Sequence, residues 1–219
     1  MCGNAGFWQL RRKKWKEGVI QERKDRVYSE PLPVGLPLPA LEEFTPVSIQ
    51  GTLQHQKEML ILKKNGGRNG FSVITPLLCP SGQSILVNRG WIPMDLKALP
   101  SRAELNTDTS VTGVLRKSSA QGKFTPANSP SIEEWYYIDI PQMSKSAGLI
   151  ETQDYYLHSL NYERSRELCD EEDLPEIPVR TSPVELMQWT ITPATHLSYA
   201  IFWFGSSLIC LYFNIRLFR

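Results

Sequence analysis

The sequence predicts an α+β protein in which a mainly antiparallel β-sheet or barrel is flanked by an N-terminal helix and a C-terminal transmembrane helix. Short β-favouring segments separated by turn residues recur from residue 46 onward, which is typical of antiparallel sheets and barrels rather than of βαβ units. A basic helical pattern precedes them, and an uncharged apolar run follows them. With 219 residues, the chain is long enough for one globular body with a core plus an anchor.

Residues 1–30 are expected to form a basic N-terminal helix, with the helical pattern clearest over 7–27. Five cations lie in its first half: Arg11, Arg12, Lys13, Lys14 and Lys16. Such a run could contact the phosphates of nucleic acid or anionic lipid, but a solvated helix face beside a membrane is the simpler interpretation. Residues 31–43 are rich in proline, which predicts a connector that runs extended over the surface.

Residues 44–191 are expected to form a β-rich soluble domain. A glycine-rich loop over 66–70 and a turn over 80–83 separate neighbouring segments, and residues 141–148 are expected to form a short helix. The predicted strands cover residues 46–52, 59–62, 71–78, 84–92, 111–115, 134–140, 155–160 and 184–189.

Residues 192–216 are expected to form a transmembrane helix. No charge occurs over 197–213, and this run approaches the length of about 20 residues that a bilayer requires. Thr192 is a suitable N-cap and Pro193 a suitable first residue, while Arg216 and Arg219 follow the apolar run. Because only Glu185 is charged over 182–195, the positive-inside rule places the C-terminus in the cytoplasm or matrix and the globular body in the periplasm or intermembrane space.

At 3.6 residues per turn, this helix has two different faces. One face is apolar and suits contact with lipid: Leu197, Ile201, Phe204, Leu208, Leu211 and Ile215. The other face is polar and aromatic, and we expect it to meet a neighbouring helix: His196, Tyr199, Trp203, Ser206, Ser207, Cys210 and Asn214.

The composition argues against several classes of chemistry. The 24 Lys and Arg residues nearly balance the 23 Asp and Glu residues, so the total charge does not indicate a nucleic-acid partner. The four cysteines include no C-x-x-C pair, which argues against a zinc site or a dense disulfide framework. Hydrolase and nucleotide-binding motifs are missing from the sequence, so we predict that the protein is not an enzyme. Arg89, at a strand end, could bind an anion, although a structural hydrogen-bonding role is commoner for such a residue.

His196 is the strongest candidate for chemistry, because ionisable residues in a membrane helix are functional by default. The N-terminal end of a helix disfavours the imidazolium, so a neutral ring could ligate haem iron. Tyr199 and Trp203 on the same face could then flank the macrocycle. The alternative is an interfacial histidine that hydrogen-bonds to water or to lipid headgroups.

Several segments occur in an order that resembles one known family. The opening segment contains Trp8, Gln9 and Arg11, and the most specific segment, 85–93, contains Asn88, Arg89, Gly90 and Trp91. The other matching segments are 46–47 with Gly51 and His55, 70–76, 113–116, 124–128, 135–139 and 196–205. Taken together, across nearly the whole chain, they resemble the Surfeit locus protein 1 family.

This resemblance implies an assembly factor, or chaperone, for cytochrome c oxidase that acts when subunit I matures and receives haem a. It implies a location in the inner mitochondrial membrane or the bacterial plasma membrane, with subunit I, other assembly factors and membrane lipid as partners. Haem a becomes the possible cofactor, with His196 as its ligand. A haem a carrier or insertase is therefore the alternative function, and an unrelated membrane-tethered hydrolase is less favoured.

The sequence departs from the family pattern at two points. The family usually has a membrane helix just before the opening motif, and only five residues precede Gly6 here, so we expect that this first transmembrane helix is missing. The asparagine usually found two residues before the histidine is Ala194, and this change would remove a hydrogen bond that could orient the His196 ring.

Overall fold

The computed structural model describes residues 2–96, 108–149, 153–161, 177–189 and 191–217. The chain divides into two compact units. One unit comprises Arg26–Leu186 and contains the β-sheet, and the other joins Met1–Asp25 to Met187–Arg219 and contains two long helices.

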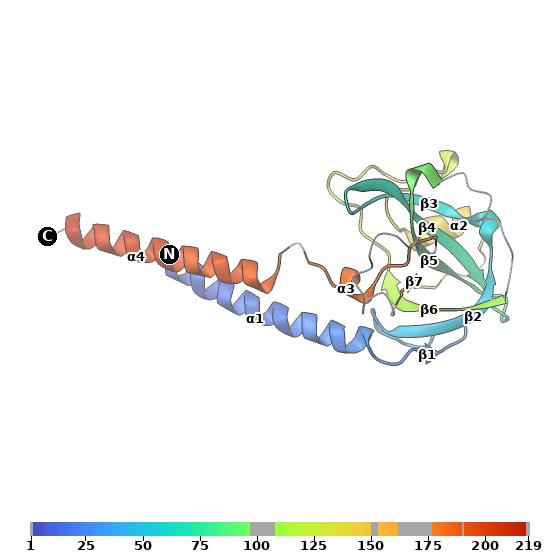
Figure 1. The fold of residues 1–219 in the computed structure, drawn as a ribbon, viewed down its shortest axis with the longest axis horizontal. Helices are drawn as coiled ribbons and strands as arrows, with labels where there is room; N and C mark the ends of the chain where they lie inside the picture. The colour runs from blue at the N-terminus through green and yellow to red at the C-terminus, as the bar shows by residue number, and fades with distance from the viewer. Residues whose placement is uncertain (1, 97–107, 150–152, 162–176, 190, 218–219) are drawn as a thin grey trace, which may run out of the picture. The chain divides into compact units, whose positions relative to one another are not determined.

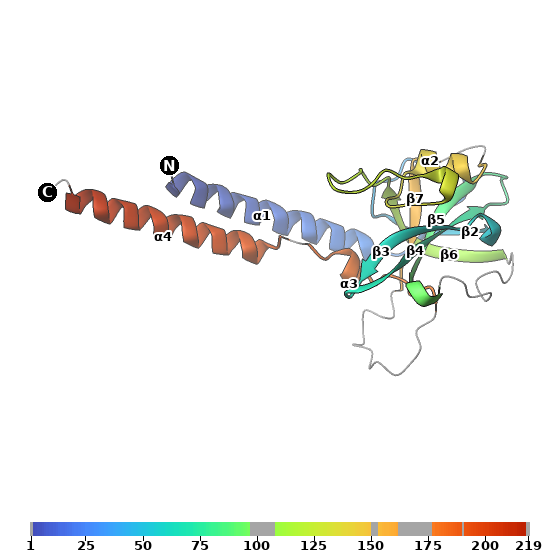
Figure 2. The ribbon, with the colours of Figure 1, turned by 90° about the horizontal axis from the view of Figure 1, so that it is seen from above.

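Seven strands in the first unit form one sheet, in the order β1-β2-β6-β7-β5-β4-β3. Neighbouring strands are antiparallel except in the pairs β1–β2 and β5–β7, which are parallel. An additional pairing of β2 with β4, at Thr52↔Leu78 and Leu53↔Leu77, closes β2, β6, β7, β5 and β4 into a small barrel. The predicted α+β class with a mainly antiparallel sheet or barrel is therefore confirmed (Figures 1 and 2). The strands are β1 (Leu32–Pro33), β2 (Pro46–Leu53), β3 (Met59–Asn65), β4 (Arg68–Leu78), β5 (Ser84–Pro93), β6 (Asp108–Lys117) and β7 (Tyr155–Ser159).

Alternate residues of the barrel strands point into one apolar cluster, which is the interior of the barrel. Every strand of the closed ring contributes: Val47, Ile49, Leu77, Ile85, Val87, Leu115 and Leu157. Residues of the opposite face pack beneath helix α2 (Ile140–Ser146) in a second cluster that includes Ile74, Leu86, Tyr156, Trp135 and Met143. The first half of strand β5 is buried on both faces, which explains its continuous apolar run Ile85, Leu86 and Val87.

The hairpin between β3 and β4 is tighter than the loop expected over 66–70. Only Gly66 and Gly67 form the turn, with φ values of +54° and +82°, and the next three residues already belong to β4. Two successive residues with positive φ match the right-handed twist of the flanking strands, and glycine adopts that conformation without steric cost.

Two predicted strands are wrong, and each is overridden by a local helix signal. Residues 134–140 make only isolated bridges before α2 begins at Ile140, where the Asp139 side chain caps the helix by accepting a hydrogen bond from the Gln142 backbone amide (3.0 Å). Residues 184–189 begin within a short helix, α3 (Pro183–Leu186). There Ser182 and Glu185 bond to each other's backbone amides at 3.2 and 3.3 Å, which is a capping box.

The proline-rich connector is extended at β1, as predicted, but it does not simply run over the surface. Leu36 is buried in the interior cluster, and Val34 and Leu38 pack against the same cluster. The connector therefore covers part of the barrel and contributes to its core.

The second unit contains helices α1 (Cys2–Val27) and α4 (Pro193–Leu217), which lie side by side and antiparallel (Figures 1 and 2). The start of α4 is as predicted, because the Thr192 side chain accepts a hydrogen bond from the Thr195 amide (3.2 Å) and Pro193 follows it. Of the helices in the described residues, α4 alone is long and apolar enough to cross a membrane.

Candidate functional site

His196 lies in the first turn of α4 and is packed against α1. Its side chain is 8% exposed, and its Nδ1 atom lies 2.8 Å from Oε1 of Gln9 on α1. An amide oxygen can only accept, so the ring donates its Nδ1 hydrogen and the lone pair remains on Nε2. Metal-binding histidines are usually oriented by a bond of this kind from the second ring nitrogen. Gln9 thus makes the hydrogen bond that orients the His196 ring, which the apolar side chain of Ala194 cannot make.

Small residues on α1 allow the two helices to approach closely. A Cβ atom on Gly6 would lie 2.7 Å from the Phe204 ring, and one on Gly3 would lie 3.8 Å from the Ser207 hydroxyl. Phe7 meets Phe204 edge to face, with 5.1 Å between ring centroids. The helix contact therefore follows His196, Phe204 and Ser207 along α4.

The expected neighbour of α4 is thus α1, but the two predicted faces of α4 need correction at Phe204 and at Tyr199, Cys210 and Asn214. Phe204, assigned to the lipid stripe, faces α1 instead, because its ring packs against Phe7 and over Gly6 of that helix. The other stripe residues are exposed: Leu197, Ile201, Leu208, Leu211 and Ile215. On the predicted polar face, Trp203, Ser206 and Ser207 are partly buried, whereas Tyr199, Cys210 and Asn214 are exposed.

The basic residues of α1 contact the segment that leads into α4. The Lys16 ammonium lies 4.7 Å from the centroid of the Trp189 ring, and the Arg23 guanidinium lies 4.6 Å from it. Lys16 also donates a hydrogen bond to the backbone oxygen of Ile191 and is nearly buried. Lys16 and Arg23 therefore contact the segment before α4 rather than forming only a solvated face. Trp8 and Arg11, by contrast, are exposed.

In the β unit, Asn88 joins three segments through a buried polar cluster. Its Oδ1 accepts hydrogen bonds from the Gly90 amide (3.1 Å) and the Ser72 hydroxyl (3.3 Å), and its amide nitrogen lies 3.5 Å from Nδ1 of His158. The other ring nitrogen of His158 lies 3.1 Å from the Thr181 hydroxyl. Burial, with smaller contributions from nearby cations, lowers the pKa of His158 to about 3, so its ring is neutral at physiological pH.

Gly90 and Trp91 fix the chain segment 177–181 against β5. Gly90 has a φ of +134°, and an added Cβ would lie 2.4 Å from the backbone oxygen of Val179. Trp91 exchanges two backbone hydrogen bonds with Val179, at 2.9 and 2.8 Å. The indole of Trp91 also donates to the Lys63 backbone oxygen (3.0 Å). Gly90 and Trp91 are therefore structural, because they allow and hold a close backbone contact.

Arg89 is the extra residue of a β-bulge, since Val73 pairs with Gly90 and the next residue, Ile74, pairs with Asn88. The Arg89 guanidinium donates to Nδ1 of His55 (3.1 Å) and forms an ion pair with Glu58 (3.4 Å). Burial and the Arg89 charge lower the pKa of His55.

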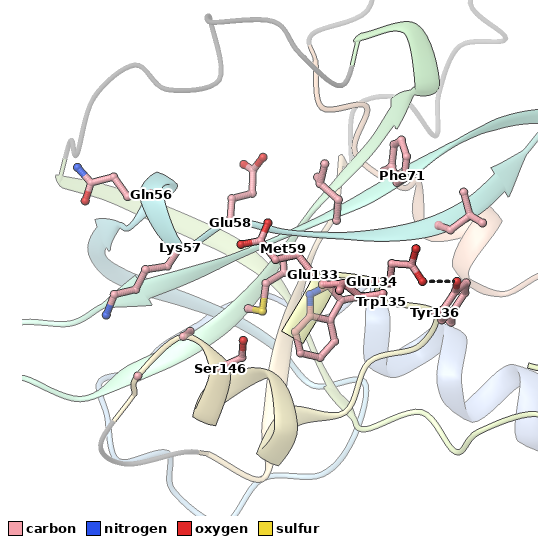
Figure 3. Close-up of a pocket in the computed structure, with 15 residues that line it drawn as sticks. Gln56, Lys57, Glu58, Met59, Phe71, Glu133, Glu134, Trp135, Tyr136 and Ser146 are labelled. Atoms are coloured by element: carbon pink, nitrogen blue, oxygen red, sulfur yellow. Dashed lines mark hydrogen bonds between the residues drawn. The ribbon is translucent and has the colours of Figure 1, made fainter. Parts of the chain in front are cut away.

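A cavity of about 820 Å³ opens beside β3 (Figure 3). Met59 and Trp135, both nearly buried, lie beside one another between β3 and α2. The dashed line in Figure 3 joins the Tyr136 hydroxyl to the Glu134 carboxylate, at 3.0 Å. Among the described residues that line this cavity, three glutamates outnumber one lysine, so it suits an apolar or cationic side chain better than an anion. These four residues are Glu58, Glu133, Glu134 and Lys57.

Within the described part of the chain, no group of three or more His, Cys, Asp or Glu side chains is placed to hold a metal ion. Cys79 and Cys210 are free thiols, and burial raises the pKa of Cys79, which makes it a poor nucleophile. Cys169 lies outside the described residues.

The family model described as SURF1 family matches residues 1–208. The chain belongs to the SURF1 family. Surfeit locus protein 1 of Gallus gallus is 34% identical over 165 residues, which cover 65% of this chain and 53% of the relative. The human protein of that name is 31% identical over 167 residues, with 65% and 55% covered, and the Arabidopsis thaliana protein is 26% identical over 258 aligned positions, with 92% and 70% covered. The chain thus spans about half the length of the curated animal relatives it matches.

The residues that the sequence analysis assigned to family motifs fall into both structural units. In the helix unit, the structure brings Gln9 and His196 together. In the β unit, Asn88, Gly90 and Trp91 hold one close backbone contact, and Arg89 points to His55 and Glu58. Sequence reasoning missed the contacts of Ser72, His158 and Thr181, because isolated polar residues carry no motif of their own.

Proposed function

We propose that this SURF1-family chain is a membrane-anchored, non-enzymatic assembly factor for cytochrome c oxidase. It acts on subunit I, with other assembly factors, at the stage when that subunit receives haem a. Membership of the family supports this role, and the apolar helix α4 supports a membrane location. The family match over residues 1–208 argues against the alternative function of an unrelated membrane-tethered hydrolase.

We place the protein in the inner mitochondrial membrane or, in a bacterium, in the plasma membrane. The β unit would lie in the intermembrane space or periplasm. Arg216 in the last turn of α4 supports a matrix or cytoplasmic C-terminus, since cationic residues are retained on that side of the membrane.

The Gln9–His196 contact is the observation that favours a direct role with haem a. It joins two family segments that are distant in the sequence, and it leaves the Nε2 lone pair of a neutral imidazole as a donor suited to iron. The residues present therefore fit a haem ligand: His196 would ligate, Gln9 would orient the ring, and Tyr199 or Trp203 could contact the macrocycle. Haem a itself would supply the iron centre that the oxidase requires. A haem a carrier or insertase is the second candidate function.

Affinity capture tests the assembly role. The full chain, expressed in its own type of cell and solubilised in mild detergent, should retain subunit I intermediates when oxidase assembly is interrupted. A variant with Leu208→Ala, on the exposed stripe of α4, should capture as much as the unaltered chain. Failure to retain subunit I from correctly inserted protein would count against the role.

Haem binding is tested separately by absorption spectroscopy of the purified protein mixed with haem a. His196→Ala should abolish stoichiometric binding, and Gln9→Ala should weaken it by about 10–100-fold while His196 is still present. Leu208→Ala, on the exposed stripe of α4, is the matched control and should bind haem a as the unaltered chain does. Equal binding by the unaltered chain and His196→Ala would remove the proposed ligand without affecting the assembly role.

A further inference from the structure

One end of the barrel holds a second cavity, of about 240 Å³, which we call the barrel-mouth cavity. Its lining comes from the end of β2, from β5, β6 and β7, and from the segment that Gly90 and Trp91 hold in place. Mouths of β-barrels are among the places where proteins commonly bind small ligands. The residues that line it and carry polar side chains are His55, Arg89, Thr109, Ser110, Thr112, Ser159 and Arg180.

The polarity of this end contrasts with the rest of the barrel. Leu157 and Val111 belong to the apolar interior, but Ser159 and Thr109, two residues further along the same strands and on the same faces, line the cavity. Arg89 is directed there by its β-bulge, a feature that often re-aims side chains beside binding sites. The interior face of the barrel therefore changes from apolar to hydrogen-bonding residues at its mouth.

The charges in the barrel-mouth cavity have one sign. Arg89 and Arg180 contribute two guanidinium groups, and the cavity has no acidic residue among its described lining residues. Glu58 pairs with Arg89 but is not part of the lining. Since a guanidinium can only donate, Nδ1 of His55 accepts from Arg89 and the neutral ring carries its hydrogen on Nε2, so His55 is also a donor.

We propose that the barrel-mouth cavity binds a small oxyanion, the carboxylate or phosphate group of a small molecule, between Arg89 and Arg180. Arginine forks match the geometry of both groups, and hydroxyl donors complete their hydrogen bonding. The cavity is smaller than the roughly 300–1,000 Å³ of sites for drug-sized ligands, which restricts it to a compact anion. Oxyanion binding here is independent of the assembly role proposed above.

Isothermal titration calorimetry of the full chain in a neutral detergent tests this site. The titrants are inorganic phosphate and succinate, with sodium chloride at matched ionic strength as the reference. At least one titrant should bind saturably with one site per chain. Saturation by phosphate alone would identify a phosphate ligand, and saturation by succinate alone would identify a carboxylate ligand. The absence of binding by both would overturn the proposal.

Two variants locate the binding. Arg180 is exposed, and Arg180→Gln should weaken the affinity at least about tenfold, because a charge-assisted hydrogen bond is lost. Lys57→Gln removes a cation from the other cavity and should leave the affinity unchanged. Unaltered affinity in Arg180→Gln would overturn the assignment. If Arg180→Gln lowers the urea midpoint, Thr109→Val tests the same cavity, with a weaker affinity expected.

A spectroscopic measurement checks the geometry independently. Burial and Arg89 lower the pKa of His55, and an anion bound beside the ring should raise that pKa, because negative charge favours the imidazolium. NMR titration of the His55 ring with and without the bound titrant measures this shift. An unchanged pKa at saturation would place the anion elsewhere and contradict the proposal.

Discussion

Replacing Gly90 with alanine should lower the free energy of unfolding by about 3 kcal/mol, because two costs coincide at this residue. Its φ of +134° lies in a region that side-chain-bearing residues rarely adopt, a strain of about 1–3 kcal/mol. An added Cβ would also lie 2.4 Å from the Val179 oxygen. Relief of that clash would move Val179 away and break its two hydrogen bonds to Trp91, at about 0.5–1.5 kcal/mol each.

Urea unfolding of the purified chain in detergent, followed by far-UV circular dichroism, measures this loss. Gly67→Ala is the matched control, because Gly67 also has a positive φ but open space around its Cβ position. It should cost about 1 kcal/mol, from backbone strain alone. In thermal unfolding, Gly90→Ala should lower the midpoint by about 6–12 °C. Equal losses in the two variants would refute the claim that Gly90 is required for the approach of segment 177–181.

Three further changes have defined outcomes. The folded pKa of His158, about 3, lies below its unfolded value of about 6.5, so the unfolded state binds the proton first as pH falls and stability is lost below pH ~6.5. Between pH 7 and 5 this residue should account for a loss of about 2 kcal/mol that is missing in His158→Gln, and parallel urea-midpoint profiles would contradict the assignment. Cysteines introduced together at Gly3 and Ser207 should form a disulfide under mild oxidation, as gel mobility would show, with each single variant correcting for native cysteines. Adding Gly6→Leu to that pair should reduce the cross-link severalfold, because the leucine would occupy space filled by an aromatic ring of α4; an undiminished yield would argue against this packing. Asp139→Ala should lower the free energy of unfolding by about 1 kcal/mol through loss of the α2 cap, and an unchanged midpoint would show that the cap contributes nothing.

The elements that could be predicted from the sequence are those with strong local signals. Thr192 and Pro193 mark the start of α4, and the apolar run over 85–87 marks β5, because capping and burial on both faces leave a direct trace in residue type. The segment 184–189 was assigned to a strand because of its apolar residues, but Ser182 and Glu185 form a capping box that decides the local structure. Closure of the barrel depends on the pairing of β2 with β4, which no local pattern encodes.

The candidate sites could likewise be predicted where a local sequence signal exists, but not where they depend on contacts between distant residues. His196 could be proposed from its type and its place in an apolar helix, but its contact with Gln9 joins residues 187 positions apart and required the folded structure. Phe204 could not be assigned to the correct face, because its apolar side chain suits lipid and a helix contact equally well. Arg89 could be recognised as part of a motif, whereas the bulge that directs it to His55 arises from the register of β4 and β5.

The central claim is that this SURF1-family chain supports assembly of cytochrome c oxidase. Its most direct test is the amount of active oxidase in membranes from source cells that lack the protein, measured against membranes in which the full-length gene has been restored. Oxidase activity should fall severalfold without the protein, other respiratory activities in the same membranes should be retained, and restoration should recover the oxidase. Oxidase activity that stays at its normal level in cells without the protein would contradict the claim.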